Sequence, residues 1–349
     1  MSTDFTGVYL PPKVDFKKQV PEKIRSVGVS IVNYRTAPLC IDAINSLFQV
    51  ENEAPRLNIV VVDSDSNDGS AEQLYEETKK LAHDQPVTLI ALKENVGFAA
   101  SNNIAIKKLL EIDPTIDALW LLNPDTVVHT GALRALIEAM GDSDKIGIVG
   151  SRLEHRNGDP QRSAFRFPGI LSEFERGAAL AFFSRLLKHW QVAPEICNTA
   201  FETDWVAGAS MLVRRDVFEK IGQFDEGYFL YYEETDLCLT AARAGFQSVY
   251  QPKSRVIHLV GSSSGVTSQN RDERRLPKYW FDSRQRYFTK NYGHIYSLLV
   301  DISWVTSLTI SHLRSWALLR KPKGPKMVIR SVITHRMQPL FRKWRITKW

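Results

Sequence analysis

The sequence predicts an α/β fold with a mostly parallel central sheet flanked by helices. Two observations support this prediction. Short apolar, β-branched runs alternate with segments of helical periodicity between residues 26 and 150, and strands that alternate with helices form βαβ units with right-handed crossovers. The chain has 349 residues, 44% of them hydrophobic, and is therefore long enough to enclose a large core.

The alternation predicts each element in turn. Residues 27–33 (VGVSIVN) form a continuous apolar run, as in a strand buried on both faces. Further strands are expected at 58–62, 87–92, 118–122 and 146–149, with helices at 38–48, 71–82, 99–110 and 130–140. After residue 150 we expect a helix at 170–189, a strand region at 205–214, a helix at 233–244, and extended segments at 247–251 and 255–259.

Cysteine usage and the N-terminal sequence favour a cytoplasmic location. Cys40, Cys197 and Cys238 are too few and too scattered for a disulfide framework or a zinc site, so we expect free thiols in a reducing compartment. Residues 1–20 contain no continuous apolar region of the kind that a secretory signal needs. The longest apolar candidate, 295–313, is interrupted by charged and polar residues and does not predict a transmembrane helix.

The basic character belongs to the end of the chain. Residues 302–349 contain eleven Lys and Arg and no Asp or Glu, so the net charge of +6 leaves the first 301 residues at −5. Aromatic residues such as Trp304, Trp316 and Trp344 lie among these basic residues at helical spacings, which is typical of an amphipathic segment on an anionic membrane surface. The alternative is a helix pair that packs on the domain or on another subunit. Because the charge is confined to one segment, no nucleic-acid partner is expected, although nucleic-acid binding through this segment is a third interpretation.

The expected sheet locates a ligand site. In open α/β sheets ligands bind beyond the carboxyl ends of the strands, and the residues there, 33–36, 63–68, 95–98 and 123–125, are rich in Asn and Asp. Neither G-x-G-x-x-G nor G-x-x-x-x-G-K-[ST] follows a strand, which excludes the usual dinucleotide and P-loop sites. A nucleotidyltransferase would carry a Gly-rich basic loop in the first turn, and this loop is absent as well.

Asn123-Pro124-Asp125 is the strongest candidate within these loops. It follows an apolar strand, and a carboxylate there is a hard oxygen ligand that suits Mg²⁺ or Mn²⁺ bridging a diphosphate. The alternative is an N-cap for the helix near Thr130, but Asp125 lies about five residues too early. Asp63 has the position to bind a base or a ribose, or to cap a turn. Gly97 permits either a close backbone approach or a positive φ.

A second acidic group follows an aromatic run, Tyr228 to Tyr232. Glu233, Glu234 and Asp236 could serve only as partners of a helix dipole. Apolar surroundings, however, raise the pKa of a carboxylate toward that of a useful base. His258 ends an extended segment, where it is either structural or a neutral imidazole ligand for a metal.

Seven segments in this order resemble glycosyltransferase family 2, in particular its bacterial rhamnosyltransferase-like branch. They cover about residues 26–295 and comprise 29–35 (VSIVNYR), 59–70 (IVVVDSDSNDGS), 95–103 (NVGFAASNN), 121–126 (LLNPDT), 205–214 (WVAGASMLVR), 222–239 (GQFDEGYFLYYEETDLCL) and 258–263 (HLVGSS). The resemblance implies an enzyme with a GT-A fold. It divides the chain into an arm at 1–25, a GT-A domain at 26–295 and a basic amphipathic helical tail at 296–349. Within the GT-A domain, 26–150 would bind the nucleotide-sugar and 151–295 the acceptor.

The resemblance also implies a donor site. By this carry-over Asn33, Arg35 and Asp63 contact the base and ribose, Asp125 is the last acid of the D-x-D metal motif, and His258 can ligate the metal. Asn123 replaces the first acid of that motif, so the metal, Mg²⁺ or Mn²⁺, has one fewer anionic ligand. The remaining residues expected around the nucleotide-sugar are Tyr34, Asn95, Gly97, Phe98, Asn103, Trp205 and Gly208.

The family's Glu-Asp base motif corresponds to Glu233-Glu234, with Glu234 in the place of the catalytic Asp. This substitution extends the carboxylate by one methylene and leaves Glu233 as the alternative base. The resemblance implies a single displacement that inverts the anomeric centre. The expected donor is dTDP-L-rhamnose, with UDP-hexose or UDP-galactofuranose as alternatives, and the expected acceptor is a glycan or lipid-linked glycan of a bacterial surface polysaccharide. The alternative function is a non-catalytic protein that binds a nucleotide-sugar or a glycan. A second copy of the chain is a further expected partner.

Overall fold

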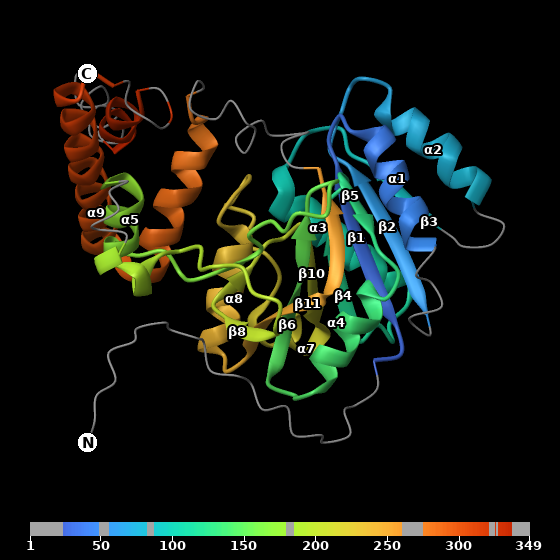
Figure 1. The fold of residues 1–349 in the computed structure, drawn as a ribbon. Coiled ribbons are helices and arrows are strands. Elements are labelled where there is room, and N and C mark those ends of the chain that lie inside the picture. Colours follow the sequence, from blue (N-terminus) through green and yellow to red (C-terminus); the bar gives the residue numbers. More distant parts are fainter. Residues whose placement is uncertain are drawn as a thin grey trace, which may run out of the picture.

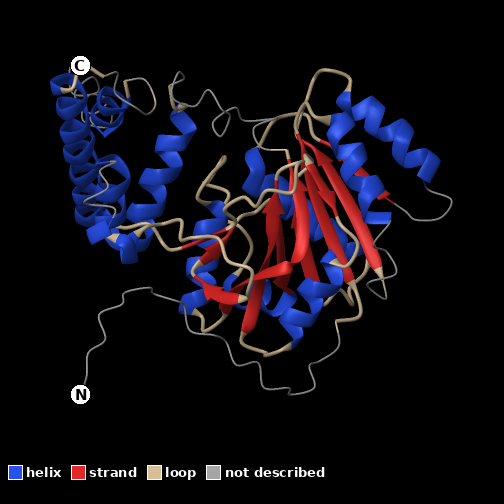
Figure 2. Cartoon of the chain, in the orientation of Figure 1, coloured by secondary structure: helices blue, strands red, loops and turns tan. Residues whose placement is uncertain are grey.

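The structure is a computed structural model that describes residues 24–48, 56–81, 87–178, 185–259, 275–320, 325 and 327–336. One large sheet dominates it, with strand order β3-β2-β1-β4-β10-β6-β11-β5 and with β8 paired to β11 (Figures 1 and 2). Helices cover both faces of this sheet, as the alternation of elements predicts. The expected arm at 1–25 lies almost wholly outside the described residues, as does most of the tail beyond residue 320.

The N-terminal half is parallel. Its strands are β1 (Val27–Asn33), β2 (Leu57–Asp63), β3 (Val87–Ala91) and β4 (Ala118–Leu122), and its helices are α1 (Ala37–Phe48), α2 (Ser70–Leu81) and α3 (Gly97–Ile112). β1 pairs in parallel with β2 on one side and with β4 on the other. The chain moves outward from β1 to β3 and then returns to the opposite side of β1. The order of the strands therefore switches between β1 and β4, and in open α/β sheets ligands bind beyond the carboxyl ends of the strands at such a point.

The second half of the sheet is mixed. β10 (Ser210–Arg214) lies antiparallel between β4 and β6 (Ile146–Glu154), and β11 (Gln247–His258) runs parallel to β6. Two short strands, β5 (Thr126–Val128) and β8 (Phe201–Thr203), pair antiparallel with β11. The other elements here are α4 (Ala132–Gly141), α7 (Arg215–Ile221), α8 (Glu233–Arg243) and the pair β7 (Ala164–Phe165) and β9 (Trp205–Val206).

Two apolar clusters, one on each face, hold the sheet between the helices. Ile31 and Trp120 belong to the cluster that includes residues of α1 and α4. Leu119 and Leu121 belong to the cluster that includes residues of α3, α8 and α9. Alternate residues of β4 therefore point to opposite cores, which explains why this strand is apolar throughout.

Helices α5 (Ile170–Ala178) and α9 (Lys278–Ala317) form a separate layer beside the sheet domain (Figure 1). α9 is interrupted at Gly293, whose φ of 86° is not helical. A buried ion pair joins α9 to α5, with Arg284 Nη2 2.9 Å from Glu173 Oε2. Residues 328–336 form a further helix, and its Val328 and Val332 pack with Trp280 and Trp304 of α9.

Several sequence predictions need correction in their bounds. Of the expected helix at 170–189, residues 170–178 form α5 and residues 185–186 are helical, residues 179–184 lie outside the described residues, and a 3₁₀ turn, η2 (Lys188–Trp190), occupies the end. The strand region at 205–214 is two strands, and the segments 247–251 and 255–259 are one strand with register shifts. The sequence patterns did not indicate β5, β8 or α7.

The tail and the cysteines agree with part of what was expected. Trp304 and Leu308 are buried in the helical layer, so the first part of the tail packs on the protein. Among the described helices, none combines the length and apolarity needed to cross a membrane. All three cysteines are free, as predicted, and Cys40 and Cys238 are buried.

Candidate active site

The Asn123-Pro124-Asp125 loop connects β4 to β5 at the expected edge of the sheet. The Asn123 N–H donates to the Ala209 carbonyl over 3.0 Å, and the Leu259 N–H donates to the Asp125 carbonyl over 2.9 Å. The Thr126 hydroxyl donates to the Asn123 carbonyl over 2.7 Å. The loop is thus held by the backbone on both sides. Helix α4 begins only at Ala132 with Gly131 as its N-cap residue, which excludes the alternative that Asp125 caps it.

Asp125 of this loop lies close to His258, the last residue of β11. β5 pairs with β11 so that Thr126 lies opposite His258, and the His258 Nε2 is 3.4 Å from the Asp125 Oδ1. The Asn123 Nδ2 is also 3.4 Å from the same ring nitrogen. Within the described ranges, which leave out residues 260–274, no third His, Cys, Asp or Glu completes a metal cluster. Two ligands about 2.1 Å from one cation and adjacent in its coordination sphere lie roughly 3 Å apart, so this pair fits a shared divalent ion.

The ends of β1 and β2 form a compact polar corner. The Asn33 Nδ2 donates to Asp63 Oδ1 over 2.7 Å, and the Ser66 hydroxyl and N–H donate to the two Asp63 carboxylate oxygens over 2.5 and 3.1 Å. Arg35 binds Ser66 through its backbone N–H and its Nε, both over 2.9 Å, and its guanidinium lies 5.0 Å from the Tyr34 ring centroid. Ser66 is not among the site residues expected from the sequence, although its spacing of three residues from Asp63 is typical of a side chain that caps a turn.

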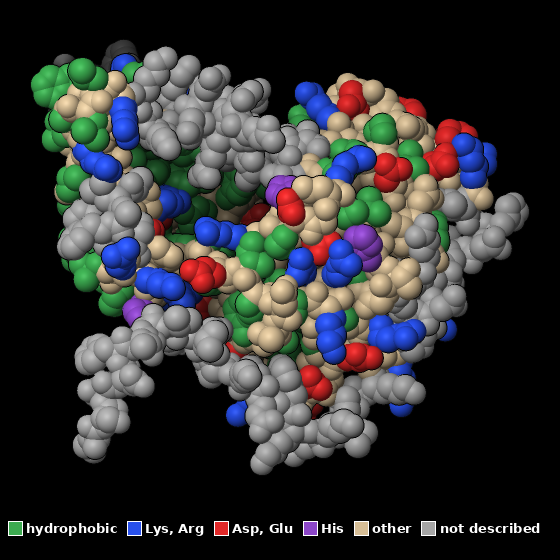
Figure 3. All heavy atoms as spheres, in the orientation of Figure 1, with side chains coloured by type: hydrophobic (Ala, Val, Ile, Leu, Met, Phe, Trp, Pro, Cys, Tyr) green, Lys and Arg blue, Asp and Glu red, His purple; other side chains and the backbone are tan. Residues whose placement is uncertain are grey.

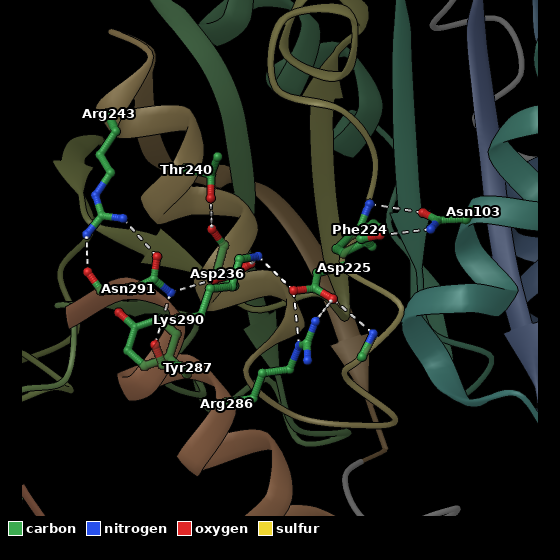
Figure 4. A network of polar contacts seen from close by, with 11 residues as sticks. Asn103, Phe224, Asp225, Asp236, Thr240, Arg243, Arg286, Tyr287, Lys290 and Asn291 are labelled. Carbon is green, nitrogen blue, oxygen red and sulfur yellow. Dashed lines mark hydrogen bonds and ion pairs between the residues drawn. The ribbon is translucent and has the colours of Figure 1, made fainter. Parts of the chain in front are cut away.

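Two of the expected donor-site residues bind the protein itself in this structure. Asn33 is 0% exposed, and its amide is shared among Asp63, Ser66 and Thr36. This places Asn33 behind Asp63, where it orients the carboxylate. Asn103 donates to the Phe224 carbonyl and accepts from the Phe224 N–H, each within 3.0 Å, so it holds the loop after α7 against α3 (Figure 4).

Trp205 likewise has a partner within the protein. Its Nε1 donates to the Arg166 carbonyl over 3.0 Å, and its ring stacks on Phe165 with centroids 4.2 Å apart. These contacts join β9 to β7. They give the indole a structural role in the strand pair that precedes the Ala207–Ala209 turn.

Gly97 lies where two backbones meet. The Asn95 Oδ1 accepts from the Gly97 N–H over 3.0 Å, and the Phe98 N–H donates to the Phe229 carbonyl over 2.8 Å. Gly97 has a φ of +85°, and a Cβ at this position would lie 2.3 Å from the Phe229 carbonyl oxygen. Gly97 therefore supplies a positive φ and leaves room for the close approach of the Phe229 backbone.

Glu233 and Glu234 begin α8 beside this contact. Glu233 is 4% exposed, and one carboxyl oxygen of each residue is shielded from solvent without a hydrogen-bond partner among the described atoms. Burial raises the pKa of both carboxyl groups, and the neighbouring Glu234 carboxylate raises the pKa of Glu233 further. A backbone hydrogen bond from Gly208 favours the ionised form of Glu234.

The third acid of this group, Asp236, belongs to an ion-pair network that ties α8 to α9 (Figure 4). It accepts from Lys290 Nζ and from Asn291 Nδ2, both over 2.6 Å. Lys290 also reaches Asp225 over 2.8 Å, and Arg286 binds the same carboxylate. The sequence gives no signal for Lys290, because its partners lie more than fifty residues away.

The solved structures most useful for comparison define the class of fold. The chain matches a mannosyltransferase of Pyrobaculum calidifontis in complex with GDP-Man and Mn²⁺ at a TM-score of 0.55 and 16% identity, over 93% of this chain and 84% of that one. It matches GalNAc-T7 with UDP, GalNAc and Mn²⁺ at a TM-score of 0.52 and 14% identity, over 93% of this chain and 58% of that one. The chain has the GT-A fold.

The sequence comparison then gives the family. The profile described as "Glycosyltransferase like family 2" matches residues 25–275, well over half of the chain, so the chain belongs to this family and is a glycosyltransferase. An N-acetylglucosaminyl-diphospho-decaprenol L-rhamnosyltransferase of Mycobacterium tuberculosis is 27% identical over 60% of this chain and 68% of its own length. Rhamnosyltransferase WbbL of Escherichia coli is 30% identical over 46% of this chain and 60% of its own length. A hexosyltransferase of low-salt glycan biosynthesis, Agl10 of Haloferax volcanii, is 25% identical over 84% of each chain.

Proposed function

We propose that this chain transfers L-rhamnose from dTDP-L-rhamnose to a hydroxyl of a lipid-linked glycan, with inversion, using a divalent cation. The single observation that carries the proposal is the meeting of two acidic centres through one turn, 207–209. Ala209 binds the backbone of Asn123 in the metal loop. A Cβ at the neighbouring Gly208 would lie 3.8 Å from the Cβ of Glu234. The proposed base Glu234 and the loop that carries the proposed metal ligand Asp125 therefore both lie beside the turn at 207–209.

Asp125 and His258 are the proposed metal ligands. Their spacing suits two ligands of one ion, and the donor's diphosphate would supply the oxygens that complete its coordination. When bound, Mg²⁺ or Mn²⁺ would neutralise the charge that grows on the leaving diphosphate. The two structures of similar fold named above contain Mn²⁺, and this likeness supports a divalent ion in the reaction of this chain.

Glu234 is the proposed base. Burial raises the pKa of its carboxyl group, which makes Glu234 a better proton acceptor than an exposed carboxylate. The hydrogen bond from Gly208 favours its ionised form, whereas Glu233 has the stronger tendency to stay protonated. Glu234 would accept the proton of the acceptor hydroxyl as that hydroxyl attacks C1 from the face opposite the diphosphate. The protein needs no nucleophile of its own in such a single displacement.

The nucleotide would lie at the polar corner formed by Tyr34, Arg35 and Asp63. Arg35, Asp65 and Asn67 have positive φ values of 59°, 58° and 52°, and such strained non-glycine residues cluster at ligand sites. The rhamnosyltransferase relatives support rhamnose as the sugar, and the alternatives are UDP-hexose and UDP-galactofuranose.

The test is a panel of nucleotide-sugars scored by thermal unfolding with Mn²⁺, with Mg²⁺ and with a chelator. A donor at one hundred times its Kd adds about 2.7 kcal/mol to the free energy of unfolding. We expect dTDP-L-rhamnose with Mn²⁺ to give the largest shift, the chelator to abolish it and to stop transfer, and Asp125→Ala to lose it. Asp144→Ala, an exposed acid, is the matched control. Transfer that persists in excess chelator contradicts the metal assignment, and a larger shift with a UDP-sugar contradicts the donor.

We also propose that the C-terminal helices rest on an anionic membrane at the cytoplasmic face, where a lipid-linked acceptor is found. α9 exposes apolar side chains on successive turns, including Ile302 at 52%, Leu313 at 60% and Trp316 at 77%, and Arg314 and Arg320 lie next to them. Trp316→Ser with Leu313→Ser should weaken binding to phosphatidylglycerol vesicles. Tyr75→Ser, which removes an aromatic residue that is 57% exposed on α2, should not. Equal binding by both variants contradicts this proposal.

A further inference from the structure

Three aromatic rings form a group between the first turn of α8 and the start of α9. The Tyr231 and Tyr279 rings are nearly parallel, with centroids 6.2 Å apart and planes at 19°. The Phe229 ring lies 5.4 Å from Tyr279. Phe229 is 37% exposed and the two tyrosines are half-buried, so the group presents ring surface to solvent. The face of the molecule drawn in Figure 3 is hollowed between the C-terminal helices and the sheet domain, with hydrophobic side chains in the visible part of the hollow.

This group adjoins the proposed base. The Phe229 carbonyl accepts from the Phe98 N–H over 2.8 Å. A Cβ at Gly208 would lie 3.7 Å from the Phe98 ring and 3.8 Å from the Cβ of Glu234, so Phe98 and Glu234 flank the same point. Tyr231 precedes Glu234 by only three residues. The nucleotide corner, in contrast, lies at the ends of β1 and β2.

The backbone that carries these rings is strained. Tyr231 and Tyr232 have φ values of 71° and 70°, a left-handed conformation in which the Cβ of a non-glycine residue crowds the following carbonyl oxygen. Packing holds the conformation in place, since the Tyr232 ring contacts Trp280, Tyr287 and Phe288. Strain that packing must support in this way is found mainly at functional sites. Here it turns Tyr231 toward Tyr279.

We propose that Phe229, Tyr231 and Tyr279 form the acceptor subsite, where their faces hold the apolar face of the acceptor sugar and direct its hydroxyl toward Glu234. A pyranose ring presents C–H groups on one face and hydroxyls at its edge. Tyrosine and phenylalanine offer rigid, flat contact area to the C–H face at a small entropic cost. The inference rests on the proposed function, since it names the site of the second substrate in that reaction.

The alternative is that these three aromatic residues have only a structural role and fill the space between α8 and α9. Tyr231 and Tyr279 do pack against the apolar cluster that contains Trp280 and Trp304. That role would make their removal costly for stability but neutral for acceptor affinity. A test must therefore separate folding from acceptor binding.

The experiment uses full-length protein and a synthetic N-acetylglucosaminyl diphosphate with a short isoprenoid chain as the acceptor probe. Binding of the probe is followed by saturation-transfer NMR, and transfer from dTDP-L-rhamnose is measured separately. We expect Tyr279→Ala and Phe229→Ala to raise the probe's Kd and its KM about tenfold, while the KM of the donor stays within twofold. Tyr279→Phe, which keeps the ring, should bind the probe with the wild-type affinity, and Tyr75→Ala on α2 is the matched control.

The outcomes are distinguishable. If the wild type binds the probe through Tyr279 but transfers no sugar from any donor, the proposed function fails and the acceptor subsite stands. If the wild type transfers sugar and the Ala variants keep its KM, or if the wild type does not bind the probe, the acceptor subsite is wrong. Melting temperatures of all variants show whether a loss of binding reflects a loss of folding.

Discussion

Gly97 offers a sharp test of how the protein supports its proposed base. At Gly97→Ala the new Cβ would lie 2.3 Å from the Phe229 carbonyl oxygen and 2.8 Å from the Phe229 Cα. Both are backbone atoms, so no side chain can rotate away to make room. The loop that carries Phe229 must move, and this loop continues directly into Glu233 and Glu234.

The expected loss of stability has two parts. A φ of +85° costs an alanine about 1–2 kcal/mol that glycine does not pay. Overpacking against a rigid neighbour adds about 1–3 kcal/mol. Gly69 isolates the first part, because its φ is +87° and nothing lies within 4 Å of an added Cβ. We therefore expect Gly97→Ala to lose about 1–3 kcal/mol more in the free energy of unfolding than Gly69→Ala.

Urea unfolding and a transfer assay measure the two consequences. A shift of about 1 Å in a catalytic group costs up to roughly a hundredfold in rate, so transfer by folded Gly97→Ala should fall at least tenfold. Gly69→Ala should keep the wild-type rate, because nothing lies within 4 Å of the added Cβ. Equal destabilisation of the two variants, or full activity of Gly97→Ala, would refute the close contact between α3 and the loop before α8.

Two further predictions concern the charged residues around α8. Lys290→Met removes the cation shared by Asp236 and Asp225. Loss of these half-exposed ion pairs should lower the free energy of unfolding by about 1–3 kcal/mol and should lower kcat by a larger factor than it changes the donor's KM. Lys80→Met, which removes an exposed pair, is the control, and an unchanged kcat together with an unchanged melting temperature would contradict the role of the network. Glu233 binds its proton more tightly in the folded than in the unfolded state, because its folded pKa is raised, so its contribution to stability is present below the ordinary carboxyl pKa and is lost as the pH rises. Glu233→Gln should therefore gain in melting temperature relative to the wild type as the pH rises above the ordinary carboxyl pKa, and a constant difference across that rise would contradict a buried, protonated Glu233.

The parallel half of the fold could be predicted because its signal is local. Val27–Asn33 and Ala118–Leu122 are buried at every residue, and a continuous apolar run indicates such a strand without knowledge of its partners. β5 and β8 have three residues each and depend on pairing with β11. No periodicity can develop over so few residues, so these strands were missed. The predicted segments 247–251 and 255–259 form the single strand β11 for a similar reason. Its pairing with β6 continues on both sides of the register shift between Gln251 and Arg255, and the local sequence does not contain that information.

The site was predictable in position but not in detail. Residues that follow buried parallel strands lie at the same edge of the sheet, and Asp63 and Asp125 lie at this edge because they end or follow β2 and β4. The direction of an amide is set by tertiary contacts, and so the sequence could not show that Asn103 binds the Phe224 backbone. The pairing of Asp236 with Lys290 depends on where α9 returns to α8, and no local pattern contains that information.

The measurement that tests the central claim most directly compares Glu234→Gln with the wild type for donor binding and for single-turnover transfer in the same preparation. The substitution keeps the shape of the side chain and removes its ability to accept a proton. We predict that the donor's Kd stays within about twofold while transfer falls by roughly 10²–10⁴-fold, the usual contribution of a general base. Transfer near the wild-type rate would contradict the assignment and move the role of base to Glu233.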